Sequence, residues 1–299
     1  MAVGKTLRRD RRRFARGRRY PRVANTDNSK TNGESEVADR RMPQFTRAIV
    51  RPPCSTFANG LTRVDLGKPD STRALHQHEQ YCCALQACGL SVLKLDADAA
   101  YPDSTFVEDA ALITERGAIL TRPGAESRAG EVAAIEPVLR QFFPELKRID
   151  APGTVDAGDV CEAGNHFFIG ISHRTNETGA RQLTRLLSEL DYSSSLIDIR
   201  EIGNILHLKS GISFLGDARL VVIDELARRP EFSELELIRI SPGEDYAANC
   251  LSVNGRVLIA SGFPSFQERL DNLGFETVAL EMSEFQKMDG GLSCLSLRF

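Results

Sequence analysis

The 299-residue sequence lacks any apolar run near the roughly 20 residues that span a bilayer, and it lacks a secretory hydrophobic segment. These absences argue against a membrane protein and against an exported, disulfide-stabilised domain. Its seven cysteines are odd in number and scattered, which favours free thiols in a reducing compartment. With 41% hydrophobic and 26% charged residues, the composition is that of a globular protein. We therefore predict a cytoplasmic protein with no membrane partner.

Residues 1–41 have few large apolar residues, no hydrophobic period and no serine enrichment. They carry 13 Lys/Arg against 5 Asp/Glu, whereas the remainder carries 25 against 36. Such a basic tract predicts a disordered, solvated extension, and neither an organelle-targeting peptide nor a nucleic-acid partner is favoured. Sequence typical of a folded domain begins directly after Met42, which is an alternative start. We predict one folded domain at 42–299, preceded by the extension at 1–41.

A pattern of hairpin, helix and strand recurs along residues 42–299. Hairpins are expected to open near Phe106, Asp159, His207 and Asn249, about 42 to 53 residues apart. Strands predicted at Val107–Glu115 and Ala118–Thr121, for example, precede a helical pattern from about Arg128 to Phe143. Pairing of the first strand, 45–51, with a C-terminal strand, 294–299, would give a fifth copy and close a ring. The prediction is a radially or linearly repeated α/β fold, radial if those two strands pair.

Polar residues gather where the predicted hairpins begin. Acids occur at 103, 108 and 109 and at 156 and 159, and a histidine occurs at 207. Carboxylates are costly to bury unless they meet cations or donors, so acids at successive strand mouths indicate a polar pocket at the centre of the ring. Arg128 and Arg174, each shortly after a hairpin, could serve that pocket. Each residue alone could instead be a helix cap, a surface arginine or a satisfied core histidine.

The C-terminal stretch contains Gly290-Gly291 followed by an alternating run, 292–297, that predicts a final strand. Paired glycines allow a tight turn and a close backbone approach. Cys294 lies where that turn becomes the strand, so its thiol could be held at a rim. Taken alone, a buried and inert cysteine would be the ordinary interpretation.

Several motifs together carry a family resemblance. They are Asn59-Gly60-Leu61-Thr62, Asp103 with Phe106-Val107-Glu108-Asp109, Thr121-Arg122-Pro123-Gly124-Ala125-Glu126-Ser127-Arg128, Thr154-Val155-Asp156-Ala157-Gly158-Asp159, Arg174-Thr175-Asn176, Leu206-His207-Leu208-Lys209, Tyr246-Ala247-Ala248-Asn249-Cys250, and Asp289-Gly290-Gly291-Leu292-Ser293-Cys294. From Met42 to Phe299 the chain resembles the dimethylarginine dimethylaminohydrolases of bacterial type, in the guanidino-group-modifying pentein superfamily. Residues 1–41 have no counterpart in that resemblance.

The resemblance implies a five-bladed α/β propeller and a cofactor-independent hydrolase. The implied reaction converts Nω,Nω-dimethyl-L-arginine, or Nω-methyl-L-arginine, to L-citrulline and an amine through an amidino-thioether on Cys294. His207 would be the acid/base, and Asp156 would orient it or hold the guanidinium; bacterial relatives often carry Glu there. The Met288 backbone would touch the substrate near the nucleophile. A homodimer is one assembly that the resemblance leaves open.

The resemblance also implies the remaining substrate contacts. In chain order they are the Leu61 carbonyl, in a mobile lid, and Asp103 for the α-amino group, Glu108 and Asp109 for the guanidinium, and Arg128 and Arg174 for the carboxylate. Elementary chemistry agrees with these roles, because carboxylates match a planar guanidinium bidentately and paired arginines do the same for a carboxylate. The partner predicted is therefore a small methylated arginine.

Three alternatives stay open at this stage. An arginine deiminase would use the same chemistry on unmethylated arginine, and an amidinotransferase would pass the amidino group to an amine, but both kinds of chain are usually longer. A catalytically silent protein that binds arginine derivatives is hard to reconcile with a nucleophile, a histidine and acids all present. A comparison of citrulline release from dimethylarginine with citrulline release from arginine distinguishes these functions.

Metal binding is predicted only as inhibition. A soft metal such as zinc should inhibit by binding Cys294 and His207 together, because thiolate and imidazole are its preferred ligands. Assays with micromolar zinc test this, and an unchanged rate would contradict it. The cluster His76-Gln77-His78-Glu79 with Cys82-Cys83 does not predict a second site, because on a helix its members face two different sides.

Overall fold

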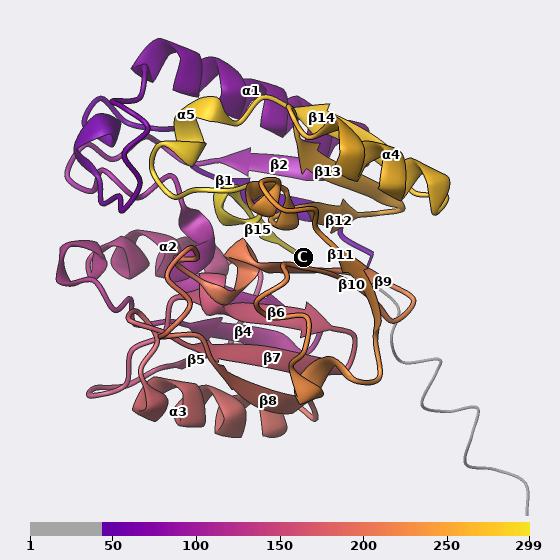
Figure 1. The fold of residues 1–299 in the computed structure, drawn as a ribbon. Helices are drawn as coiled ribbons and strands as arrows, with labels where there is room; N and C mark the ends of the chain where they lie inside the picture. The colour runs from indigo at the N-terminus through magenta and orange to yellow at the C-terminus, as the bar shows by residue number, and fades with distance from the viewer. Residues whose placement is uncertain (1–43) are drawn as a thin grey trace, which may run out of the picture.

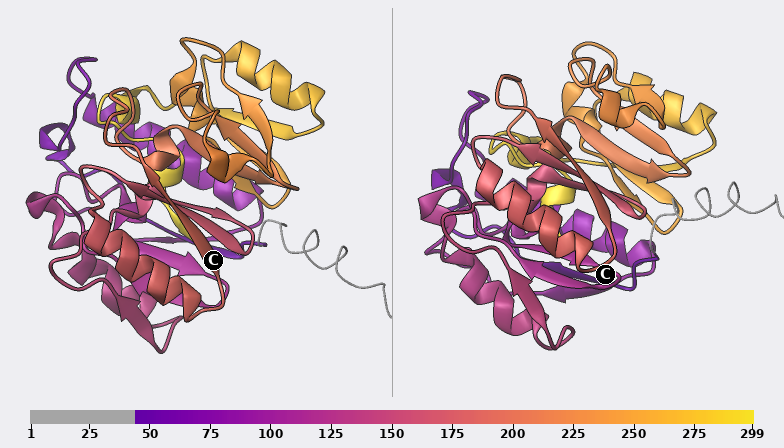
Figure 2. Two further views of the ribbon diagram at one scale, coloured as in Figure 1. Left: turned by 60° about the horizontal axis from the view of Figure 1, so that its bottom comes forward. Right: turned by 90° about the horizontal axis from the view of Figure 1, so that it is seen from below.

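The computed structural model describes residues 44–299. The predicted extension, 1–41, and the alternative start at Met42 lie outside the described residues. Five three-stranded sheets make up the fold, and Figures 1 and 2 show them around a common centre with the longer helices on the outside. The predicted five-bladed α/β propeller is therefore confirmed.

The sheets follow one plan. In each, an inner and a middle strand are antiparallel, and the middle and outer strands are parallel. From inside outward the strands are β15 (Leu297–Arg298), β1 (Arg47–Val50) and β2 (Ser91–Lys94); β3 (Ala111–Thr114), β4 (Gly117–Leu120) and β5 (Leu146–Arg148); β6 (Val160–Ala163), β7 (His166–Ile171) and β8 (Ser193–Asp198); β9 (Ile212–Gly216), β10 (Arg219–Val222) and β11 (Glu236–Arg239); and β12 (Leu251–Val253), β13 (Arg256–Ala260) and β14 (Glu276–Leu280).

Helices supply most of the parallel crossovers, because parallel neighbours cannot be joined by a tight turn. They are α1 (Ser71–Ala87), α2 (Glu131–Leu139), α3 (Glu177–Ser188) and α4 (Pro264–Asn272), with a short α5 (Ser283–Gln286) after the last crossover. The fourth sheet uses a 3₁₀ turn, Pro230–Phe232, in place of an α-helix. No helix in the described part of the chain is long and apolar enough to cross a membrane.

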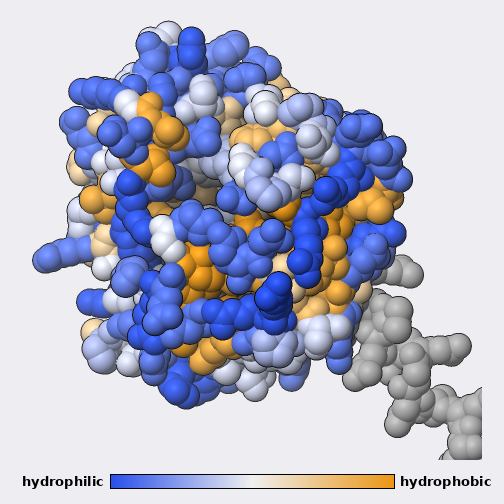
Figure 3. Space-filling model, in the orientation of Figure 1, coloured by the Kyte–Doolittle hydropathy of each residue, from blue (hydrophilic) through white to orange (hydrophobic). Residues whose placement is uncertain are grey.

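The ring closes as predicted, by pairing of the first strand with a C-terminal one. Ala48 is in register with Arg298 and Ile49 with Leu297. Apolar clusters join each sheet to the next around the ring, which makes the sheets one packed body. On the face shown in Figure 3, hydrophilic residues cover most of the surface, and apolar residues show mainly towards its middle.

The predicted strand starts were too early. Each of the five inner strands is preceded by a one-turn 3₁₀ segment: Val107–Ala110, Ala157–Asp159, Leu208–Ser210, Asp245–Ala248 and Ser293–Leu295. We call them the inner turns. The final strand is correspondingly short, because the N–H of Ser293 donates to the Asn249 side chain (3.0 Å) and that of Cys294 to the Gly291 carbonyl (3.2 Å), not to a neighbouring strand.

Candidate active site

Three of the inner turns, together with loops from other parts of the ring, bring most of the predicted site into one cavity. Its lining contains eight of the ten predicted site residues: Leu61, Asp103, Asp109, Arg128, Arg174, His207, Met288 and Cys294. Phe106, Leu206, Asp289 and Gly290 complete it. Residues from sheets far apart in sequence thus converge, as the acids at the strand mouths predicted.

Cys294 and His207 are both buried in this lining, with exposed fractions of 9% and 6%. The paired glycines make the predicted close approach: a Cβ at Gly290 would lie 2.2 Å from the Phe106 ring. Behind the histidine, a Cβ at Gly158 would lie 2.8 Å from both His207 Nδ1 and Asp109 Oδ1. Glycine at these positions lets the turns meet around the cavity.

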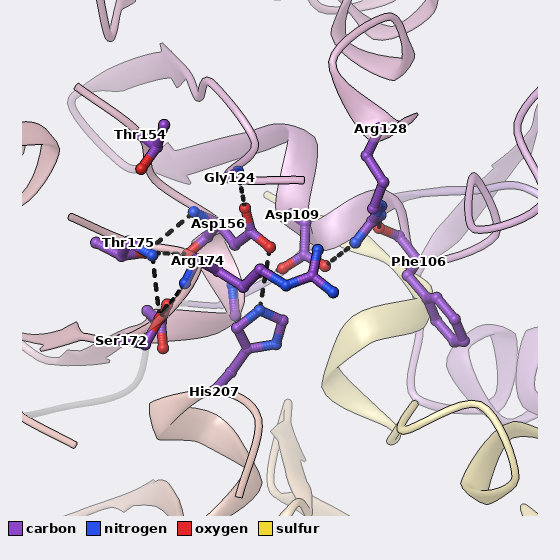
Figure 4. Close-up of polar contacts among 12 residues, drawn as sticks. Phe106, Asp109, Gly124, Arg128, Thr154, Asp156, Ser172, Arg174, Thr175 and His207 are labelled. Carbon is purple, nitrogen blue, oxygen red and sulfur yellow. Dashed lines mark hydrogen bonds and ion pairs between the residues drawn. The ribbon is translucent and has the colours of Figure 1, made fainter. Parts of the chain in front are cut away.

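Asp156 lies behind His207 instead of in the lining. Its Oδ2 is 3.1 Å from His207 Nε2, and its Oδ1 accepts a hydrogen bond from the Gly124 N–H at 2.7 Å. Asp156 has no exposed surface. Of the two predicted alternatives for this residue, the geometry fits orientation of the imidazole, and Figure 4 shows the two side chains pointing at each other.

Arg174 offers an unpaired cation. Its Nη1 is buried and has no hydrogen-bond partner among the described residues. In Figure 4 its guanidinium extends towards the Asp109–Arg128 pair. A buried donor without a partner costs free energy, so an anion that enters the cavity would be stabilised there.

Arg128, in contrast, is already held on several sides. Its Nη1 donates to Asp109 Oδ2 at 2.6 Å, and Glu131 accepts from its Nε at 3.0 Å and from its Nη2 at 2.8 Å. The carbonyls of Asp103 and Phe106 accept from the same Nη2. Arg128 therefore fixes the wall of the cavity and keeps little capacity for a further anion.

Glu108 is the other predicted residue that does not line this cavity. Its carboxylate lies 2.6 Å from Lys209 Nζ and accepts from Ser293 Oγ at 2.9 Å. These three residues line a second cavity at the centre of the ring, together with residues of all five inner strands. Consecutive residues of the inner turns, such as Glu108 and Asp109, thus face different cavities. The strand pattern in the sequence did not predict which of the two acids faces which cavity.

A segment that follows Gly60 lies against the first of these two cavities, which we call the substrate cavity, and Leu61 lines it. Both carboxylate oxygens of Asp103 accept from the Leu61 N–H, at 3.1 and 3.2 Å. The guanidinium of Arg63 donates to the carbonyls of Gly203 and Ile205, just before His207. The predicted lid is thereby placed against the site. Arg63 was not anticipated, because its partners are backbone carbonyls that leave no mark in the sequence.

The sequence of this chain is similar to those of characterised proteins. The chain is 45% identical over 256 residues to N(G),N(G)-dimethylarginine dimethylaminohydrolase of Pseudomonas aeruginosa, covering 85% of this chain and 100% of the relative. The chain belongs to the dimethylarginine dimethylaminohydrolase family. The Streptomyces coelicolor member is 35% identical over 84% of this chain and 96% of its own length. No family model matches the sequence.

Solved structures agree with this membership. A Pseudomonas aeruginosa dimethylarginine dimethylaminohydrolase structure, a cysteine-to-serine variant complexed with citrulline, superposes with a TM-score of 0.83 at 44% identity, over 86% of this chain and 100% of that chain. The N-terminal domain of ArgZ, an arginine dihydrolase, superposes with a TM-score of 0.73 at 19% identity and shows the shared fold alone.

In this dimethylarginine dimethylaminohydrolase site, burial and neighbouring charges shift the pKa values of His207, Asp109 and Cys294. Burial alone would lower the pKa of His207, but the nearby carboxylates of Asp109, Asp159 and Asp156 outweigh it and raise that pKa to about 9. Burial raises the pKa of Asp109, but His207 and Arg128 bring it down to about 2. Burial, helped by Glu108 and Asp109, raises the pKa of the Cys294 thiol to about 12. At neutral pH the free site therefore holds an imidazolium, an ionised Asp109 and an un-ionised thiol.

Three side chains beside the cavity could together hold a metal ion. Within residues 44–299, one set has its donor atoms within 4.8 Å of one another: Asp109, Asp156 and His207. The helix α1 cluster behaves as predicted, with His76 and Cys83 exposed and His78 and Cys82 on another side. Those two are buried, however, and burial lowers the pKa of His78 to about 4. One side of the cluster therefore packs in the core and the other faces solvent.

Proposed function

We propose that the chain hydrolyses Nω,Nω-dimethyl-L-arginine and Nω-methyl-L-arginine to L-citrulline, with release of dimethylamine or methylamine. The observation that carries this proposal is the cavity that Cys294, His207 and Asp109 share with the unpaired cation of Arg174. Membership of the family and the citrulline-bound relative support the same substrate class. The preference for methylated arginines over arginine is the most specific part of the proposal.

The substrate would lie with its guanidinium at Asp109 and its carboxylate at Arg174. The low pKa of Asp109 keeps it ionised, and a carboxylate pairs with the planar cation through directed hydrogen bonds. Asp103 and the Leu61 carbonyl are the proposed contacts of the α-amino group, and the Met288 backbone lies near the reacting end. Since Glu108 is committed to Lys209 and Ser293, we propose that it supports the wall behind the nucleophile.

The first half of the reaction is thiol addition. A guanidinium bound beside the sulfur favours the thiolate, because an opposite charge lowers the pKa of a thiol. Cys294 Sγ attacks the guanidino carbon, and the imidazolium of His207 gives its proton to the substituted nitrogen. The C–N bond breaks, the amine leaves, and an amidino-thioether remains on Cys294.

The second half is hydrolysis. The now neutral His207 takes a proton from water, and the resulting hydroxide attacks the amidino carbon. The C–S bond breaks, citrulline forms, and the sulfur returns as a thiolate. Asp156, hydrogen-bonded to Nε2, holds the imidazole in place through both halves. Every proton has a donor and an acceptor among these groups and water, so the proposed route uses no cofactor.

The test is citrulline release by the full chain from asymmetric dimethylarginine, from monomethylarginine and from arginine at equal concentrations. Product from the methylated substrates, with matching amine, is the expected result. Preference for unmethylated arginine would instead indicate a deiminase. No citrulline from any of the three would favour a binding protein.

The pH dependence of kcat/KM tests the charge state of the free site. The reactive pair, a thiolate beside an imidazolium, holds one proton fewer than the thiol and imidazolium present at neutral pH. Since kcat/KM reports ionisations of the free enzyme, it should rise about tenfold per pH unit and level off near the lower pKa, about 9. Initial rates at low dimethylarginine concentration measure this. A fall between neutral pH and that value would contradict the assignment.

Replacement of Arg174 tests the carboxylate site. Arg174→Ala removes a charge-assisted pair with the substrate, an interaction of about 1.5–3 kcal/mol, so KM should rise roughly 10- to 100-fold with a smaller change in kcat. Arg181→Ala removes an exposed arginine of α3 and is the matched control, with unchanged kinetics expected. A fall in kcat at unchanged KM would place Arg174 in the chemical step instead.

The compartment and the assembly are proposals as well. All seven cysteines are free, which suits a reducing compartment, and we propose the cytoplasm. The homodimer stays a prediction, and light scattering of the purified full chain would test it.

A further inference from the structure

Asp159 is a buried carboxylate that the proposed reaction does not use. It has no exposed surface and does not line the substrate cavity. Burial raises its pKa to about 6, despite hydrogen bonds and the nearby His207 that lower it. Because a buried carboxylate is costly unless donors satisfy it, the groups that donate to Asp159 indicate its role.

Two donors from different blades share this carboxylate. Asp159 Oδ2 accepts from the Ser172 hydroxyl at 2.6 Å, and Asp159 Oδ1 accepts from the Leu208 backbone N–H at 3.0 Å. Leu208 directly follows His207. One oxygen therefore holds the turn that presents the acid/base, and the other reaches towards the turn after β7.

The Ser172 hydroxyl extends the link to Arg174. Its oxygen accepts from the backbone N–H groups of Arg174, at 2.9 Å, and Thr175, at 3.0 Å, contacts drawn around Ser172 in Figure 4. A backbone N–H can only donate, so the single hydroxyl hydrogen goes to Asp159. The chain of contacts runs from Arg174 through Ser172 and Asp159 to Leu208, with every hydrogen assigned.

We propose that Asp159 is a positioning residue that fixes the distance between the substrate-carboxylate site at Arg174 and the acid/base at His207. This inference rests on the proposed function. A substrate anchored by its carboxylate presents its guanidino carbon at one distance from that anchor. Misplacement of a reacting group by about 1 Å can cost on the order of 10²-fold in rate. The contacts through Ser172 and Asp159 fix this distance, and neither side chain needs to touch the substrate.

The surroundings leave the link little room to adjust. A Cβ at Gly170, in β7, would lie 3.1 Å from Asp159 Oδ1 and 3.0 Å from Leu208 Cβ. The backbone of β7 thus packs directly against the carboxylate and the histidine-bearing turn. An amide in place of the carboxylate would also aim its NH₂ group at one of two obligatory donors, so Asp159→Asn must break one of the two contacts.

The test compares two substrates in the full chain. They are asymmetric dimethylarginine and its decarboxylated analogue, which has the same guanidino group but nothing for Arg174 to bind; the analogue is followed as turnover or as competitive inhibition. Ser172→Ala cuts the branch to Arg174, and Asp159→Asn disturbs both branches. Ser213→Ala is the matched control, because Ser213 is a buried serine whose hydroxyl donates to the Ala248 carbonyl at 2.7 Å, outside the substrate cavity.

Positioning predicts losses that depend on the substrate carboxylate. We expect kcat/KM for dimethylarginine to fall roughly 10-fold in Ser172→Ala and about 10²-fold in Asp159→Asn. For the decarboxylated analogue, the kcat/KM or the inhibition constant of Ser172→Ala should stay within about twofold of the value for the unsubstituted chain. The reason is that Arg174 has no carboxylate to anchor in this analogue. Ser213→Ala should change neither substrate.

Two results would overturn the inference. One is an unsubstituted chain that is active on dimethylarginine while both variants keep its kinetics. The other is an equal loss on both substrates in Ser172→Ala, which indicates general disruption. If Asp159→Asn does not fold, as judged by near-ultraviolet circular dichroism, the two-substrate contrast in Ser172→Ala decides alone. An inactive unsubstituted chain would instead refute the proposed function.

Discussion

Cys294→Ser is expected to abolish citrulline production, with kcat lowered by about 10⁴-fold or more. Oxygen replaces sulfur in nearly the same volume, so the buried inner turn should keep its structure. A serine hydroxyl is a far weaker nucleophile than a thiolate and has no paired base close to its oxygen in the proposed route. Substrate binding should persist, since Asp109 and Arg174 are unchanged.

Measurements of rate and of binding distinguish loss of the chemical step from loss of substrate affinity. Citrulline formation measures the loss, and equilibrium dialysis with labelled dimethylarginine measures retained affinity. Cys83→Ser, at an exposed thiol of α1, is the matched control and should keep full activity. Substantial activity in Cys294→Ser would sink the covalent mechanism, whereas equal loss in both variants would point to a general effect of thiol removal.

His207→Asn is expected to lower kcat by about 10³-fold, within the 10²–10⁴-fold range for loss of a general acid–base group. Asparagine is too short to reach Asp156 from the position of Nε2, but the Gly124 N–H still donates to that carboxylate, so it is not left without a partner. The loss should be smaller for a substrate whose leaving group departs without a proton, such as an S-alkyl thiocitrulline. Hydrolysis would then be the slow step, so the amidino-thioether should accumulate.

Intact mass measured during turnover detects that adduct on Cys294. His76→Asn, at an exposed position of α1, is the matched control and should show neither the rate loss nor the adduct. If the slow variant shows the same loss for both leaving groups and no adduct, His207 does not act as the acid that releases the amine.

The repeat could be predicted from the sequence because it is a local property. Each blade has its own local pattern of a hairpin and, in most blades, a helix, so spacing indicated four units. The fifth unit depended on pairing of the first strand with a C-terminal one, and the structure shows that pairing. Helix α1 is equally local, because its N-cap at Asp70 and its hydrophobic pattern are carried by adjacent residues.

Orientation within the inner turns could not be predicted in the same way. Glu108 and Asp109 are adjacent acids, yet one meets Lys209 in the central cavity and the other meets Arg128 beside the substrate cavity. Strand alternation was the available rule, and a 3₁₀ turn does not follow it. The same turn geometry shortened the predicted final strand and concealed the role of Asp159, whose partners are Ser172 of its own blade and Leu208 of the next.

Pairing of β1 with β15 has a consequence for the order in which activity arises. A strand made early in synthesis waits, with one edge unpaired, until a partner some 250 positions later is available. Cys294 lies in the turn that leads into that partner. A growing polypeptide would therefore carry its acids and its imidazole long before it gains the sulfur, and it would stay chemically silent until the circle is joined.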